Sequence, residues 1–122
     1  MIGYTTLGTN DFERAANFYD ELLKVCGASR LMELDGFLLW GTSFDQACLA
    51  LVNPFNEEPA SVGNGVMVAI RASSKEEVDA LYRKALELGG ADEGAPGERI
   101  EGFYAGYFRD LDGNKLNAFV MG

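Results

Sequence analysis

Residues 102–120, GFYAGYFRDLDGNKLNAFV, contain two runs of apolar and aromatic side chains on either side of the tetrapeptide DGNK at 112–115. Gly and Asn adopt positive φ angles readily, and an Asp side chain can accept hydrogen bonds from its own backbone. Asp-Gly-Asn between two such runs is therefore typical of a tight turn. The stretch predicts a β-hairpin with strands at 103–109 and 115–121 and a turn at 110–114.

The second strand of this hairpin has two different faces, because side chains alternate along a strand. One face carries Asn117 with Lys115 and Phe119. A polar amide in mid-strand with aromatic neighbours indicates either a lined cavity or the solvated face of a half-buried sheet, and the sequence leaves both open. The opposite face is apolar throughout and consists of Leu116, Ala118 and Val120.

Length and charge limit the possible partners. The chain has 122 residues, enough for one domain with an ordinary core. Its 10 basic and 19 acidic side chains give a formal charge of −9, and a basic footprint is what binds nucleic acid or an anionic membrane. No apolar run approaches the ~20 residues that span a bilayer, and we see no signal peptide. We expect no nucleic acid and no membrane as partners. Cys26 and Cys48 predict reduced thiols in a cytoplasmic protein.

The sequence contains no histidine. Histidine is the commonest general base in enzymes and the commonest side-chain ligand of transition metals. Its absence excludes the Ser-His and Cys-His pairs that activate a nucleophile.

Two parts of the chain repeat one order of predicted elements. The first contains a strand at 2–9, a helix capped by Asn10 and closed by Gly27, and strands at 28–34, 37–41 and 47–53. The second contains a strand at 66–72, a helix that Ser74 caps and Gly89-Gly90 end, a glycine-rich stretch at 91–100 and the hairpin. The two caps are 74 − 10 = 64 residues apart. The chain 1–122 therefore reads as one domain with a duplicated βαβββ module: module 1 at about 1–53, a linker at 54–65 rich in Pro, Gly, Asn and acid, and module 2 at about 66–122.

The run YFRDLDGNKLNAFV at 107–120 resembles the C-terminal signature of the vicinal oxygen chelate superfamily, which includes glyoxalase I, bleomycin-resistance proteins and extradiol dioxygenases. That signature is an aromatic strand, then D-P-D-G-N, then a strand carrying a glutamate metal ligand. Here Leu111 replaces the proline, and Asn117 stands at the glutamate position. With the duplicated modules, the resemblance covers the whole chain. It implies an α+β fold in which two curled mixed sheets surround a cavity, with a helix outside each, and it implies a homodimer.

The resemblance also implies where relatives hold a divalent metal, with a ligand from the first and the last strand of each module. The matching positions here are Tyr4, Ala50, Met67 and Asn117, where relatives usually carry histidine or glutamate. A phenol, a methyl group, a soft thioether and a neutral amide provide no charged ligand for such a cation. We expect no metal and no other cofactor, and hence neither the metal-dependent isomerisation nor the ring cleavage of relatives.

The predicted cavity lining, aromatic and small aliphatic with few polar groups, is typical of a small-molecule pocket. Arg71 is expected to anchor a carboxylate or phosphate, or else to be exposed at a strand end. Trp40 and the pair Tyr104 and Tyr107 are expected to stack on a planar ligand, or else to fill the core. The expected ligand-binding residues are Tyr4, Thr6, Trp40, Ala50, Met67, Arg71, Tyr104, Tyr107, Asn117 and Phe119.

Three functions follow from these expectations. The first is metal-free binding of a small molecule that is partly aromatic or anionic, similar to the bleomycin-resistance branch, whose basic ligands would also suit an acidic chain. The second is a lyase or isomerase of the glyoxalase type that works without the usual metal. The third is a dimer whose cavity is filled by its own side chains and whose role is contact with another protein. The sequence favours binding over catalysis and leaves the ligand unidentified.

Overall fold

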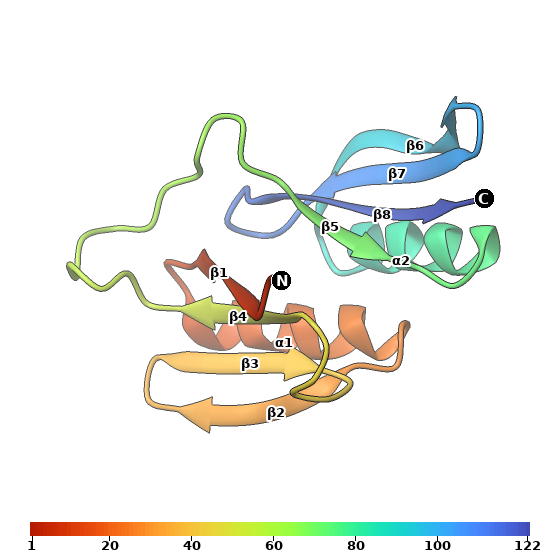
Figure 1. The fold of residues 1–122 in the computed structure, drawn as a ribbon. Helices are drawn as coiled ribbons and strands as arrows, with labels where there is room; N and C mark the ends of the chain where they lie inside the picture. Colours follow the sequence, from red (N-terminus) through yellow and green to blue (C-terminus); the bar gives the residue numbers. More distant parts are fainter. The chain divides into compact units, whose positions relative to one another are not determined.

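The computed structural model describes all residues 1–122, which form two compact units, Met1–Ser61 and Val62–Gly122. Each unit contains one helix and one four-stranded sheet. Figure 1 labels these elements along the chain. From here on, module 1 and module 2 name these two units, each of which includes part of the predicted linker at 54–65. The stretch between their sheets, residues 53–67, contains no helix or strand, in agreement with the sequence-based prediction for 54–65. The predicted α+β class with two modules is confirmed.

Module 1 has a mixed sheet in the order β1-β4-β3-β2. Its edge strand β1 pairs in parallel with β4, and the other two pairings are antiparallel. A parallel neighbour cannot be reached through a tight turn, so the chain crosses over through α1 and a hairpin. The elements are β1 (Tyr4–Gly8), α1 (Phe12–Lys24), β2 (Ser29–Leu34), β3 (Phe37–Gly41) and β4 (Cys48–Val52).

The N-cap of α1 is Asp11 and not Asn10, so the sequence-based prediction of the cap was wrong by one residue. The Asp11 side chain accepts a hydrogen bond from the Arg14 backbone N–H at 3.2 Å. The Asn10 amide instead makes two hydrogen bonds with the backbone of Ala60, donating from Nδ2 at 3.0 Å and accepting at Oδ1 at 2.7 Å. Asn and Asp are equally good N-caps, and the contact that decides between them is 50 residues away in the chain.

Module 2 repeats this arrangement, with the sheet order β5-β8-β7-β6 and a parallel pairing of β5 with β8. The hairpin of β7 and β8 has the predicted bounds, and its turn is held by Asp110, whose carboxylate accepts from the backbone N–H groups of Asp112 and Asn114 at 2.9 Å each. The predicted cap of α2 is confirmed, since the Ser74 hydroxyl accepts from the Glu77 N–H at 3.1 Å. The elements are β5 (Val68–Arg71), α2 (Lys75–Glu87), β6 (Ala91–Ile100), β7 (Phe103–Arg109) and β8 (Lys115–Met121).

The two modules match each other element by element, with an offset of 63 residues for the first strand and the helix and of 67 for the last strand. Both helices have 13 residues, and their first residues are 75 − 12 = 63 positions apart. The pair Thr6↔Ala50 in module 1 corresponds to Ala69↔Asn117 in module 2, which gives offsets of 69 − 6 = 63 and 117 − 50 = 67. By the same offsets Tyr4 corresponds to Met67. The four positions that the superfamily resemblance singled out are therefore two structurally equivalent pairs.

In each module the helix covers one face of the sheet, and the largest buried side chains are on that face. In module 1 the Trp40 ring packs against Tyr19 of α1, with ring centroids 5.8 Å apart. In module 2 Phe108 and Leu116 lie on the face toward α2 and are fully buried. We call the opposite side of each sheet the helix-free face. It carries Tyr4, Thr6, Leu39, Cys48 and Ala50 in module 1, and Ala69, Arg71, Tyr107, Lys115, Asn117 and Phe119 in module 2.

Candidate functional site

Asn117 is at the centre of the helix-free face of module 2. It pairs with Ala69 on β5 and with Tyr107 on β7. Its side chain is 1% exposed, and its Oδ1 atom has no hydrogen-bond partner. Leaving a buried polar atom unpaired costs about 1–3 kcal/mol, so such atoms are uncommon in folded proteins. The unpaired Oδ1 atom in mid-strand makes Asn117 the candidate binding residue of this face.

Three basic side chains are on the same side of this sheet, each over an aromatic ring. The Arg71 Cζ atom is 5.0 Å from the centroid of the Phe119 ring. The Arg99 Cζ atom and the Lys115 Nζ atom are 5.3 Å and 5.6 Å from the centroid of the Tyr107 ring. None of these three cations forms an ion pair with a carboxylate, whereas Arg109 nearby is engaged by Glu93 at 2.6 Å.

A hollow of about 520 Å³ adjoins Lys115 in module 2. Lys115 and Arg109 are cross-strand partners, so both side chains point to the helix-free face. The loop before β5 closes the other side of the hollow. The lining residues are Val62, Gly63, Asn64, Gly65, Val66, Met67, Arg109 and Lys115. The predicted residue Met67 thus lines a hollow together with two cations.

The helix-free face of module 1 has a different character. Leu39, Cys48 and Ala50 form a buried apolar cluster, and the partly buried Leu31 and Phe37 pack against it. The Tyr4 ring contacts Phe37 edge to face, with centroids 6.0 Å apart. Thr6 is exposed on the edge strand β1. No buried polar side chain lacks a partner on this face.

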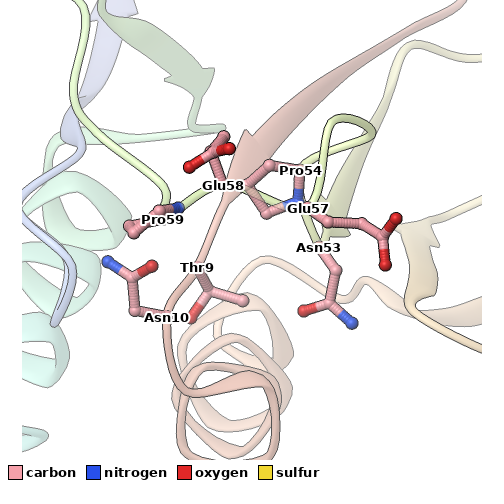
Figure 2. Close-up of a pocket in the computed structure, with 7 residues that line it drawn as sticks. All are labelled: Thr9, Asn10, Asn53, Pro54, Glu57, Glu58 and Pro59. Carbon is pink, nitrogen blue, oxygen red and sulfur yellow. The ribbon is translucent and has the colours of Figure 1, made fainter.

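A second hollow, of about 410 Å³, lies in module 1 at the end of β4. Its lining residues are Thr9, Asn10, Asn53, Pro54, Glu57, Glu58 and Pro59 (Figure 2). The carboxylates of Glu57 and Glu58 point to different sides in Figure 2 and do not converge on one point. The Asn10 amide is already bonded to the backbone of Ala60. We assign no ligand site to this hollow.

Trp40 lies on the helix side of its sheet and not on the helix-free face. It is fully buried, and its Nε1–H donates to Asp20 Oδ1 at 2.9 Å. Asp20 also accepts two hydrogen bonds from Arg30, at 2.8 Å and 2.7 Å, and these bonds lower the pKa of the Asp20 carboxyl. The placement of Trp40 is that of a core residue, which is the alternative that the sequence left open.

Tyr104 and Tyr107 point to opposite faces of β7, so they do not form one stacking site. The Tyr104 hydroxyl donates to Asp79 Oδ1 of α2 at 2.7 Å, and this carboxylate raises the pKa of the phenol. Tyr107 lies on the helix-free face beside Asn117. Residues three apart on a strand alternate to opposite sides, so this separation follows from the strand assignment itself.

Three basic residues of this face, Arg99, Arg109 and Lys115, were not among the predicted ligand-binding residues. Lys115 could have been found, because it has the same parity as Asn117 along β8. Arg99 could not, because the pairing of β6 with β7 shifts register between Asp92 and Gly94, between Gly94 and Gly97, and between Glu98 and Ile100. Each shift interrupts the alternation that assigns a side chain to a face.

A family model described as the Glyoxalase/Bleomycin resistance protein/Dioxygenase superfamily matches residues 1–118. The chain belongs to this superfamily. No match was found among curated proteins. No helix in the structure is both long and apolar enough to cross a membrane.

Several solved structures resemble this one over most of their length. A glyoxalase/bleomycin resistance protein from Albidiferax ferrireducens T118 is 31% identical, with a TM-score of 0.92 over 100% of this chain and 99% of its own. The hypothetical protein SA1046 from S. aureus is 27% identical, with a TM-score of 0.74 over 98% and 92%. A lactoylglutathione lyase from Agrobacterium tumefaciens is 25% identical, with a TM-score of 0.70 over 98% and 92%.

The side chains at the metal positions that the superfamily resemblance implies do not fit a divalent cation. Ala50 has no donor atom and is part of the apolar cluster with Leu39 and Cys48. Its equivalent, Asn117, offers a neutral amide, and the equivalent pair Tyr4 and Met67 offers a phenol and a soft thioether. The chain contains no group of three or more Asp, Glu, His or Cys residues placed to hold a metal.

Proposed function

We propose that this superfamily member binds a small organic molecule on the helix-free face of module 2 without a resident metal. The observation that carries the proposal is the buried Asn117 amide, whose Oδ1 atom lacks a partner although it lies on a face lined by aromatic rings. An unpaired buried acceptor lowers stability, and such strain is characteristic of functional sites. A ligand with an N–H or O–H group would satisfy this atom.

The proposed ligand face comprises Asn117, Tyr107, Phe119, Arg71 and Met67. Its aromatic surface with a few polar groups matches the usual lining of small-molecule sites. The donor chemistry of Tyr4, Ala50, Met67 and Asn117 supports binding without a metal. Tyr4, Thr6 and Ala50 of module 1 are not needed for this proposal.

We also propose that the protein is a homodimer in the cytoplasm. Each module leaves a parallel edge strand, β1 or β5, whose outer backbone groups lack a neighbour in its own sheet. Large apolar side chains beside these edges are exposed, including Ile2, Tyr4, Val66 and Met67. Edge strands with exposed apolar side chains are typical of surfaces that another chain covers. Light scattering would then give twice the mass of the chain, and a monomeric mass would contradict this part of the proposal.

A ligand screen on the intact protein tests the binding proposal. Each hit is then measured against both the wild type and the variant Asn117→Leu. A true ligand raises the melting temperature by mass action, and isothermal titration calorimetry gives its affinity. Hits should bind the wild type and lose at least about tenfold in affinity in the variant, because a hydrogen bond to a buried group is lost. Hits that bind both proteins equally would show that the Asn117 face is not the site. Elemental analysis should find no stoichiometric transition metal.

A further inference from the structure

We infer that the ligand is a small planar acid that also carries a hydrogen-bond donor, such as a hydroxylated aromatic carboxylate. This inference rests on the proposed binding function and names the chemical class of its ligand. It depends on three features of the helix-free face of module 2: cations without counter-ions, aromatic rings beneath them, and a buried acceptor between them.

The charge of this face is opposite in sign to that of the whole chain. The chain has a formal charge of −9, yet Arg71, Arg99 and Lys115 form no ion pair. Glu93 of β6 pairs with Arg109 at 2.6 Å and with none of these three cations. Arg99 and Lys115 lie at the same Tyr107 ring without counter-ions and repel one another, and an anion placed beside them relieves the repulsion. The negative net charge of the chain would favour a basic ligand. The cations of this face would repel such a ligand.

The rings on this face determine the shape of the ligand. Phe119 and Phe103 are stacked, with centroids 5.6 Å apart and an interplanar angle of 23°. Arg71 lies over the Phe119 ring, and Arg99 and Lys115 lie over Tyr107. A planar ring can pack against these aromatic side chains while its acidic substituent reaches the guanidinium or ammonium groups.

The third feature is the need for a donor. Asn117 lies beside Tyr107 across the sheet and two residues before Phe119 on the same strand, so it is between the two rings that the cations contact. Its Oδ1 atom can only accept a hydrogen bond, and a simple carboxylate has no proton to give it. A ligand that satisfies both the cations and Asn117 therefore needs an anionic group at one position and an O–H or N–H group at another.

The test compares four probes of nearly equal size by isothermal titration calorimetry with the full chain. The probes are 4-hydroxybenzoate, benzoate, 4-hydroxybenzamide and 4-hydroxybenzylamine. We expect 4-hydroxybenzoate to bind most tightly. Benzoate should lose at least about tenfold because it leaves Asn117 unsatisfied, and 4-hydroxybenzamide should lose a similar factor because it lacks the charge. The cationic amine should not bind measurably.

Two variants and a matched control locate the effect. Arg71→Gln and Lys115→Gln each remove one cation from the face, and each should weaken 4-hydroxybenzoate by about tenfold while leaving the affinity for 4-hydroxybenzamide unchanged. Arg83→Gln removes the same charge from the exposed surface of α2 and should change neither affinity. If all three variants lose the same affinity for 4-hydroxybenzoate, the effect comes from the net charge of the protein and not from this face. That result would overturn the inference.

The failure of this inference is distinguishable from failure of the proposed function. Amide chemical shifts of Ala69, Tyr107 and Asn117 report on the face directly. If the neutral amide or the amine binds more tightly than the acid and shifts these signals, the binding function stands and the acidic ligand class is wrong. If none of the probes shifts these signals, and the wider screen finds no ligand that depends on Asn117, both proposals are wrong.

Discussion

The two modules share a backbone and differ on one face. Equivalent pairs of residues, Trp40 with Phe108 and Leu51 with Ala118, are buried on the helix side of both sheets. On the helix-free side, Leu39 and Ala50 of module 1 correspond to Tyr107 and Asn117 of module 2. The duplicated fold therefore conserves the packing under the helix while the other face is free to change. Module 1 has an apolar cluster where module 2 has a polar and basic surface.

The largest expected effect tests the shared part of this comparison. Trp40→Ala and Phe108→Ala remove equivalent buried rings and should each lower the free energy of unfolding by about 3–5 kcal/mol, as for other large-to-small changes in a core. Urea denaturation measures both. A loss under about 1 kcal/mol in either variant would show that the two helix faces are not packed alike.

The next effect tests the difference between the helix-free faces by exchanging residues. Ala50→Asn places an unpaired amide in the apolar cluster of Leu39 and Cys48 and should destabilise by about 1–3 kcal/mol. Asn117→Leu removes the unpaired oxygen and should leave stability unchanged or raise it by about 1 kcal/mol. A variant of Asn117 that unfolds more easily and still binds ligand normally would assign this residue a structural role instead.

A smaller effect concerns the charged network of module 1. Arg30 holds the pKa of Asp20 below its ordinary value, so the carboxylate contributes stability that is present above the unfolded pKa of about 3.9. This contribution is lost as the pH falls through the lower folded pKa. Asp20→Asn should cost about 1 kcal/mol at pH 7 and flatten the acid limb of the stability curve below about pH 4. If the variant and the wild type lose stability equally as the pH falls, Asp20 does not contribute to the acid limb of the stability curve.

The smallest effect compares the two helix caps. Asp11→Ala and Ser74→Ala each remove a side-chain acceptor at equivalent positions and should cost about 1 kcal/mol each. Asn10→Ala breaks the exposed contact with Ala60 and should leave the start of α1 intact. Amide hydrogen exchange at Arg14 and Glu77 measures how well each capped N–H group is protected. Faster exchange at Arg14 in the Asn10 variant would show that Asn10 caps α1 after all.

Local chemistry explains how much could be predicted from the sequence. The bounds of β7 and β8 and the Ser74 cap depend on residues within five positions of each other, and the pattern of the sequence predicted them. The choice of Asp11 over Asn10 depends on Ala60 and was not visible locally. The sequence left both a stacking role and a core position open for Trp40, and its hydrogen bond to Asp20, 20 residues earlier, shows the core position.

Some features of the candidate site could likewise be predicted from the sequence, and others are visible only in the folded chain. Asn117 was found because its position in the hairpin is unusual for a polar residue, and its burial and unpaired oxygen could be seen only in the folded chain. Arg71 and Phe119 come together through the parallel pairing of β5 with β8, which joins residues 48 positions apart. The cationic character of the face depends on Arg99, whose direction is set by the bulges of β6.

The most direct test of the central claim is the affinity of 4-hydroxybenzoate for the full chain, measured by calorimetry before and after exhaustive dialysis against a chelator. Our account predicts the same affinity in both samples, with loss of binding in Asn117→Leu. Binding that disappears with the chelator and returns with an added transition metal would contradict it.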